Sequence, residues 1–373
     1  MTSSPRIIRG TTFVFLAFDV AFAVDLDAAE RLLTGASAER ATIRHSRKAP
    51  PYFEYRPAPL RIALPADSLP VVDGHATSAQ VELLVFDFGA ISVGYRVPLA
   101  GHLEGLVDLA DALYDNQTFV ADAYKRLEQI VRIIGPALQR PHVDTAVEDY
   151  LVHQIEELEG FAEPADALDV NAELIARILR SERGPISGQE MAEALSASAS
   201  YRPDDTVLVD WNAAMLLDRE AEDVRAVLEF ANIEALEMRV LDDRLDATLD
   251  EAYKAFLDRR AHRLGGLIPL PGRGPMLRIA HLQIDSALLY EAVNNAIKLV
   301  GDQYLARVYR LAATRLHLPE RDASIERKLS TLESIYAKLE DAQSALRMEL
   351  LEWIIIILIA VSIVIPFFVS GAK

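Results

Sequence analysis

LLEWIIIILIAVSIVIPFFV, residues 350–369, is the stretch that decides the expected fold. Twenty residues in a helix span roughly 30 Å, which matches the hydrocarbon core of a bilayer. A buried core helix is the alternative, but four consecutive isoleucines leave no polar face for solvent. We therefore predict a C-terminal transmembrane helix over residues 351–369, with membrane contacts from Trp353, Ile354, Ile357, Val361, Pro366 and Phe368.

A heptad pattern leads directly into this run. Mostly apolar residues alternate at spacings of three and four, which is typical of a coiled-coil seam; the predicted seam includes Leu329, Leu332, Tyr336, Leu339, Gln343 and Leu346. Gln343 is its polar member, and such a residue can specify register. A long helix from about residue 278 to 316 precedes the seam, and the connection between them is short. We therefore predict an antiparallel, coiled-coil-like helical hairpin stalk over residues 276–350 that self-associates into a homo-oligomer.

The rest of the chain predicts an α+β fold. Alternating apolar residues indicate strands at 11–20 and 60–64 and a hairpin of strands at 81–88 and 91–97, with helices following at 102–114 and 118–134. These elements form a predicted head, residues 1–140, with a small, mostly antiparallel sheet. Residues 141–264 are predicted to be helical, including a helix at 144–158, with one further strand near 206–211.

Composition restricts the classes of function. The chain has 373 residues, a net charge of −18 and no cysteine. This charge argues against general binding to nucleic acid or anionic lipid, and the lack of cysteine excludes disulfides and thiolate sites. An apolar segment after Arg6 and Arg9 ends in Ala21-Phe22-Ala23 and resembles a signal peptide, but Asp19 interrupts it and alternation favours a strand. We therefore expect a single-pass C-terminal anchor with the bulk of the chain cytoplasmic.

No catalytic motif is found, so the catalytic residues are unknown and no cofactor or metal is predicted. In a helix, His142 and His153 would lie three turns apart, too distant to share a metal. The acidic side chains of Asp242 and Asp246 share a predicted helix face and could hold a divalent cation, but interleaved arginines favour ion pairs. A metal-dependent membrane-bound hydrolase is the alternative that these carboxylates leave open.

One basic cluster has aromatic neighbours: Arg44, Arg47, Lys48, Tyr52 and Phe53. Rings beside cations can bind single-stranded RNA or phospholipid head groups. A solvated loop with its aromatics packed on the sheet is the favoured interpretation. An RNA- or ribosome-tethering factor at the membrane is the alternative.

Several segments together resemble the YagE / required-for-meiotic-nuclear-division family, whose shared domain has no assigned activity. They occur in the family's order across nearly the whole chain and include TFVFLAFDVAFAVDLDAAERLL from Thr12, LLVFDFGAISVGY from Leu83, GDQYLARVYRLAATRLHL from Gly301 and RMELLEWIIIILIAVSIVI from Arg347. The resemblance implies membrane attachment and self-association, and mitochondrial relatives are linked to organelle translation. It supplies no catalytic residues.

The sequence as a whole predicts a membrane-anchored, non-enzymatic interaction or scaffold protein. Its cytoplasmic head would be held from the bilayer by the helical stalk, and the stalk would assemble copies of the chain. The protein partners that it would join are not specified by any motif.

Overall fold

The computed structural model describes residues 5–33, 37–41, 57–65, 69–160, 164–264, 284, 286–288, 290–291 and 303–370. These residues divide into two compact units. The first contains Met1–Val240 and Leu289–Asp322, and the second contains Leu241–Leu288 and Ala323–Lys373. Two helices, α6 (Glu222–Leu264) and α9 (Leu318–Ser370), have residues in both units. The domain boundaries expected from the sequence stay a prediction.

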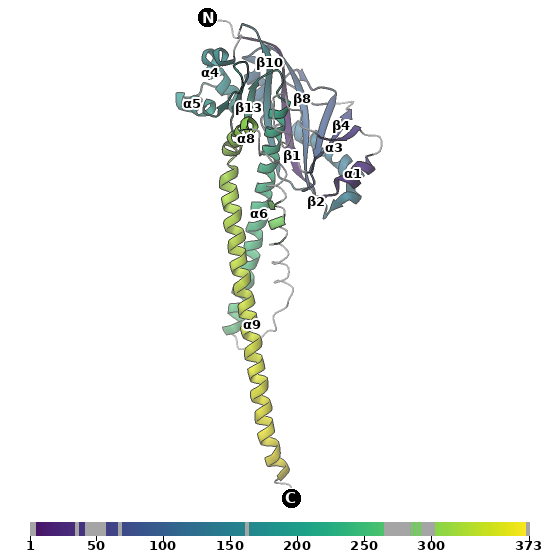
Figure 1. Ribbon diagram of the computed structural model, residues 1–373, viewed down its shortest axis with the longest axis vertical. Coiled ribbons are helices and arrows are strands. Elements are labelled where there is room, and N and C mark those ends of the chain that lie inside the picture. The colour runs from purple at the N-terminus through teal and green to yellow at the C-terminus, as the bar shows by residue number, and fades with distance from the viewer. Residues whose placement is uncertain are drawn as a thin grey trace. The chain divides into compact units, whose positions relative to one another are not determined.

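A nine-stranded sheet is the centre of the first unit in its described residues, in the order β11-β12-β13-β10-β1-β8-β7-β4-β3 (Figure 1). The neighbours are antiparallel except for β10 and β13, which are parallel. The strands are β1 (Arg6–Asp19), β3 (Ser37–Arg40), β4 (Leu60–Pro65), β7 (Gln80–Val85), β8 (Ala90–His102), β10 (Val147–Leu158), β11 (Ser198–Ala199), β12 (Thr206–Val209) and β13 (Ala213–Leu217). Two short pairs lie outside this sheet: β2 (Ala23–Val24) with β9 (Leu138–Gln139), and β5 (Val71–Val72) with β6 (His75–Ala76).

The α+β class is therefore confirmed, but the sheet is large, whereas the sequence predicted a small one. The main reason for this difference in sheet size is β10, because the sequence analysis predicted a helix at residues 144–158. Acidic residues lie near both ends of this strand, a composition that suggested an exposed helix. In the structure these acids have tertiary partners: Glu148 pairs with Arg239 at 2.8 Å and Glu156 with Arg9 at 2.5 Å.

Successive side chains of β1 point to opposite faces of the sheet. Val14, Leu16 and Phe18 belong to the main hydrophobic core. Helices contribute to the same core on this face: α1 (Leu26–Leu32), α2 (Gly105–Leu113), α3 (Gln117–Ile134) and α4 (Pro164–Arg180). Side-chain caps fix where two of them begin, because Asp25 accepts from the Ala28 amide and Asn116 from the Thr118 and Phe119 amides. A 3-10 turn, η1 (Gly135–Ala137), follows α3, and α5 (Gly188–Ser196) follows α4.

The first part of α6 lies on the other face of the sheet. Its Asn232 amide donates to the Glu148 carbonyl at 3.1 Å, and its Arg225 lies 4.3 Å from the Phe13 ring centroid. Phe230 packs against Phe86, with ring centroids 6.1 Å apart. Because strands β1 and β10 are covered on both faces, β1 is buried along most of its length and β10 is buried over residues 150–155.

The hairpin between β7 and β8 confirms the one predicted around Gly89. This glycine has φ +101°, and a Cβ atom added to it would lie 1.8 Å from the Ala21 carbonyl oxygen. Its own carbonyl accepts from the Val20 amide at 3.0 Å. The turn therefore requires glycine for both backbone conformation and close approach.

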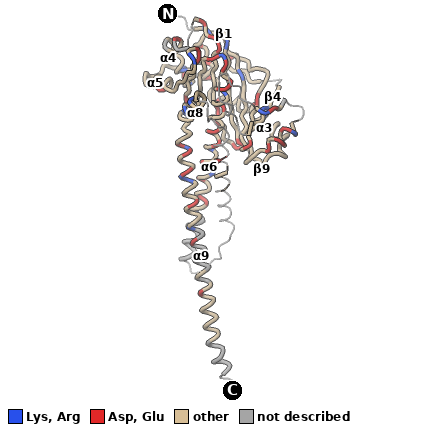
Figure 2. The backbone as a smooth tube through the Cα atoms, in the orientation of Figure 1, with Lys and Arg blue, Asp and Glu red and all other residues tan. Residues whose placement is uncertain are grey.

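Helices α8 (Gln303–Arg315) and α9 follow one another across His317, which has φ +56°. In α9, Ile325 and Leu332 are buried. Beyond Glu352 the helix carries no charged residue, and the part of this end that Figure 2 colours by residue type is tan.

The predicted membrane anchor is wrong. A membrane-crossing helix needs about 20 mainly apolar residues, and none of the helices in the described part of the chain is both long and apolar enough. The transmembrane helix expected at residues 351–369 is therefore contradicted, and so is the C-terminal anchor on which the expected localisation rested.

Candidate functional site

The turn between β12 and β13 holds a buried carboxylate, that of Asp210, which forms ion pairs with two arginines. Two buried strands bring the chain into and out of this turn, and the Asp210 amide donates to the Ala213 carbonyl at 2.9 Å. The Asn212 carbonyl accepts from the Leu151 amide of β10 at 3.3 Å. Asp210 is 0% exposed and Asn212 is 5% exposed. The backbone of the turn is thus tied to the sheet on both sides.

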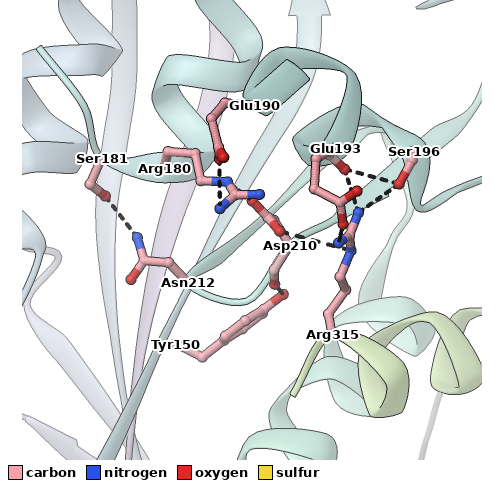
Figure 3. A network of polar contacts seen from close by, with 9 residues as sticks. All are labelled: Tyr150, Arg180, Ser181, Glu190, Glu193, Ser196, Asp210, Asn212 and Arg315. Atoms are coloured by element: carbon pink, nitrogen blue, oxygen red, sulfur yellow. Dashed lines mark hydrogen bonds and ion pairs between the residues drawn. The ribbon is translucent and has the colours of Figure 1, made fainter. Parts of the chain in front are cut away.

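Two guanidinium groups flank the Asp210 carboxylate (Figure 3). Arg180 Nε, at the last residue of α4, lies 2.5 Å from Asp210 Oδ2, and Arg315 Nε, at the last residue of α8, lies 3.8 Å from Oδ1. Arg180 also reaches Glu190 Oε2 of α5 at 3.4 Å. Burial raises the pKa of Asp210, and the positive charges of Arg180 and Arg315 oppose this rise.

Arg315 joins this carboxylate to the end of α5. Its Nη2 donates to Ser196 Oγ at 2.7 Å and to the Glu193 carbonyl, and its Nη1 donates to Glu193 Oε1. The hydrogen bond from Arg315 lowers the pKa of the Glu193 carboxyl. A cation at this place also suits the negative end of the α5 dipole. One side chain of α8 therefore holds three segments of the head together.

Two further hydrogen bonds complete the Asp210 cluster, which we define as Tyr150, Arg180, Ser181, Glu190, Glu193, Ser196, Asp210, Asn212 and Arg315. Tyr150 Oη donates to the Asp210 carbonyl at 2.8 Å, and Asn212 Nδ2 donates to Ser181 Oγ at 2.8 Å. Burial raises the pKa of Tyr150, so its phenol stays protonated at neutral pH. With its carboxylate neutralised by two arginines and its phenol held on a carbonyl, the cluster is suited to positioning the turn rather than to acid–base chemistry.

The positioned turn displays a large side chain. Trp211 lies between two buried residues, yet it is 42% exposed. Its ring contacts Tyr114, with centroids 6.3 Å apart and planes at 90°. The buried cluster thus supports an exposed aromatic pair.

The residues predicted for the stalk and the anchor lie on α9. Leu329 and Tyr336 are half-buried, whereas Leu332 is buried. The side chains of Leu339, Gln343 and Leu346 lie outside the described residues, as do those of Pro366 and Phe368. Large side chains expected to contact lipid are exposed, namely Trp353, Ile354, Ile357 and Val361.

The other predicted sites are dispersed. The basic and aromatic residues Arg44, Arg47, Lys48, Tyr52 and Phe53 lie outside the described residues. His142 Nε2 contacts Asp19 Oδ2 at 2.9 Å, in a loop, and the buried His153 Nδ1 contacts Thr12 Oγ1 at 2.9 Å, in β10. The helical geometry predicted for this histidine pair is wrong because the segment is a strand.

The acidic residues of α6 are bridged by a lysine. Lys328 Nζ lies 2.7 Å from Asp242 Oδ1 and 2.6 Å from Asp246 Oδ1. A cation of the chain therefore already occupies the place considered for a metal. Among the residues that the structure describes, no group of three or more His, Asp or Glu side chains is arranged to hold a metal ion.

Sequence reasoning missed the Asp210 cluster. Arg180, Asp210 and Arg315 come from segments far apart in the chain, and no motif connects them. The available signal was local: Asp210, Trp211 and Asn212 interrupt two apolar segments, where polar residues commonly form a turn.

Comparison with known proteins gives a family without an assigned activity. Residues 9–223 match the family described as "Uncharacterized protein MJ0711, N-terminal domain". The Methanocaldococcus jannaschii protein described as "Uncharacterized protein MJ0711" is 23% identical over 232 residues, which cover 61% of this chain and 68% of that protein. No solved structure matches this chain. These matches overturn the resemblance to the YagE / required-for-meiotic-nuclear-division family. Because the match covers more than half of the sequence and includes Asp210, the chain belongs to the MJ0711 N-terminal domain family.

Proposed function

We propose that this protein is a non-enzymatic, self-associating scaffold whose copies assemble through the distal part of α9. One observation carries the proposal: a run of large apolar side chains is exposed to between 46% and 63% along this helix. These side chains are Met348, Leu351, Trp353, Ile354, Ile355, Ile356, Ile357, Leu358, Ile359 and Val361.

An apolar surface of this kind is unfavourable in water. Completely burying one large apolar side chain contributes about 1.5–3 kcal/mol. Residues 353–359 are consecutive, so they occupy every side of the helix, and a single neighbouring helix can cover only part of that surface. A bundle of identical helices would cover more of it. Contiguous exposed apolar surface is a general mark of an interaction site.

Charge also favours assembly at this end of α9. No ionisable side chain lies between Trp353 and Ser370, so identical helices would meet there without like-charge repulsion. Further toward the N-terminal end of α9, Ile325 and Leu332 are already buried within a single chain. These observations support the distal segment, rather than the first turns of the predicted seam, as the self-association surface.

Sedimentation of the full-length chain tests the proposal. Ile354 and Ile357 are 51% and 56% exposed, so their replacement leaves the chain's own packing almost unchanged. Burying the exposed half of each would contribute about 1 kcal/mol, and charges in the interface add to the loss. Ile354→Asp/Ile357→Asp should therefore weaken association by about thirtyfold or more.

Lys338→Asp is the matched control, because it places the same residue on an exposed position of α9 before the apolar run. Its association should equal that of the wild type. A monomeric wild-type chain, or equal association of the double variant and the wild type, would disprove the proposal.

A further inference from the structure

The exposed pair of Trp211 and Tyr114 lies on the head, within the family domain. Trp211 comes from the β12–β13 turn, and Tyr114 is the C-cap residue that follows α2. They are 42% and 49% exposed, and their rings meet edge to face. Each aromatic ring therefore keeps a large part of its surface open to a partner.

The two neighbours of Trp211 in the β12–β13 turn contact other segments of the head. Asp210, which precedes Trp211, has its carboxylate between the two arginines of the cluster, and its amide donates to the Ala213 carbonyl. Asn212, on the other side, is fixed to Ser181. A turn whose backbone is already tied to its neighbours loses little freedom when it binds, so this arrangement is suited to recognition.

Acidic residues lie close to Tyr114 in the sequence. Asp108 and Asp111 project from α2, the helix that Tyr114 follows, and their side chains are 59% and 40% exposed. Arg183 Nε lies 3.3 Å from Asp108 Oδ1 and 2.9 Å from Asp111 Oδ2. The Arg183 side chain is itself 59% exposed, so its ion pairs contribute little to stability. Another guanidinium group can therefore take its place. Asp115, which follows Tyr114, is exposed as well.

We propose that Trp211, Tyr114, Asp108 and Asp111 form a docking surface for an extended, arginine-bearing segment of a partner protein. One arginine would stack on the open indole face, and another would replace Arg183 between the two carboxylates. A guanidinium group suits both positions because it is planar, stacks on aromatic faces and pairs with carboxylates through two hydrogen bonds. The two carboxylates outnumber Arg183, and the exposed Asp115 next to Tyr114 adds a further negative charge. The surface shares no residue with the apolar part of α9.

A fluorescence titration can test this inference on the full-length chain. The sequence contains two tryptophans, so in a Trp353→Phe background Trp211 is the remaining reporter. The probe is a fluorescein-labelled peptide of four Gly-Arg repeats, and peptides with Lys or Glu in place of Arg are compared with it. We expect saturable binding that raises the anisotropy and changes the Trp211 emission, with Arg tighter than Lys and no binding of the Glu peptide.

Variants distinguish binding of the peptide at this site from general electrostatic attraction to an acidic protein. Asp108→Asn/Asp111→Asn should weaken binding of the Arg peptide by about tenfold or more. In the native-tryptophan chain, Trp211→Ala should do the same in anisotropy. Glu128→Gln/Asp204→Asn removes the same charge from two exposed positions and should leave binding unchanged. Equal effects of the two charge-removing pairs, or no change in Trp211 emission at saturation, would overturn the inference.

Sedimentation of Trp211→Ala distinguishes a partner protein from a second copy of the chain. We expect the assembly state of this variant to equal that of the wild type, because assembly is assigned to α9. Loss of assembly in Trp211→Ala would make this surface a self-interface and refute the docking of a partner segment. Loss in Ile354→Asp/Ile357→Asp with peptide binding intact would support both proposals independently.

Discussion

Replacing Glu234 by glutamine should remove a pH dependence from the stability of the head. Glu234 is 3% exposed on α6, and Tyr309 Oη donates to its Oε2 at 2.5 Å. Burial raises the pKa of Glu234 from 4.5 to about 7, although the hydrogen bond from Tyr309 opposes the rise. Glutamine keeps the size of the side chain and an oxygen for Tyr309 but does not ionise.

Because the pKa of Glu234 is raised in the folded chain, this carboxyl lowers the stability of the head as the pH rises. Below pH 4.5 the Glu234 carboxyl is protonated in both the folded and the unfolded chain, so it does not change the free energy of unfolding. As the pH rises toward 7 the unfolded chain ionises first, and the free energy of unfolding falls. A rise in pKa from 4.5 to about 7 corresponds to about 3 kcal/mol.

Urea unfolding between pH 4.5 and 8 measures this quantity in both proteins. His153 acts in the opposite direction, because burial lowers its pKa to about 4 and stability from this group is lost as the pH falls below 6.5. Its contribution cancels when the variant is compared with the wild type. The stability of Glu234→Gln relative to the wild type should therefore increase by about 3 kcal/mol across this range.

Glu326→Gln, at an exposed position of α9, is the control and should differ from the wild type by a constant amount. A difference between Glu234→Gln and the wild type that does not vary with pH would refute the reasoning. It would mean that the Glu234 carboxyl is ionised in the folded chain throughout this range.

Two further substitutions test the cluster and the hairpin by urea unfolding at pH 7. Arg315→Met should lower the free energy of unfolding by about 3 kcal/mol, because it removes one of two cations from buried Asp210 and the contacts with α5. The control is Arg310→Met, at an exposed position of the same helix, which should lower it little. Equal losses in the two variants would contradict the role of the cluster. Gly89→Ala should cost about 2 kcal/mol or more, because the new methyl group would meet the Ala21 carbonyl at a positive φ. Gly105→Ala has open space around its Cβ, and an equal loss in both variants would show that the close approach is unimportant.

Local patterns were sufficient for several elements of the head. The hairpin around Gly89, the strand at 60–64 and the helices at 102–114 and 118–134 were all predicted from alternation, helical spacing and turn residues, and the structure confirms them. Each of these signals depends on neighbours in the sequence. They identify an element without showing how many strands share its sheet.

Strand β10 shows where local reasoning failed. Its acidic ends resemble the exposed face of a helix, but its centre is buried between β1 and β13. Burial on both faces and remote partners such as Arg239 decide that this segment is a strand. The same reliance on local hydropathy led to the wrong prediction of a membrane anchor at the end of α9.

The sequence by itself determined the α+β class, the turns and the apolar character of α9, because composition and short-range spacing control these properties. Only the tertiary structure decided the site. Asp210 acquires its two arginines from the ends of α4 and α8, and Trp211 contacts Tyr114, which follows α2. Such contacts form when the sheet brings distant segments together, so no spacing in the sequence encodes them.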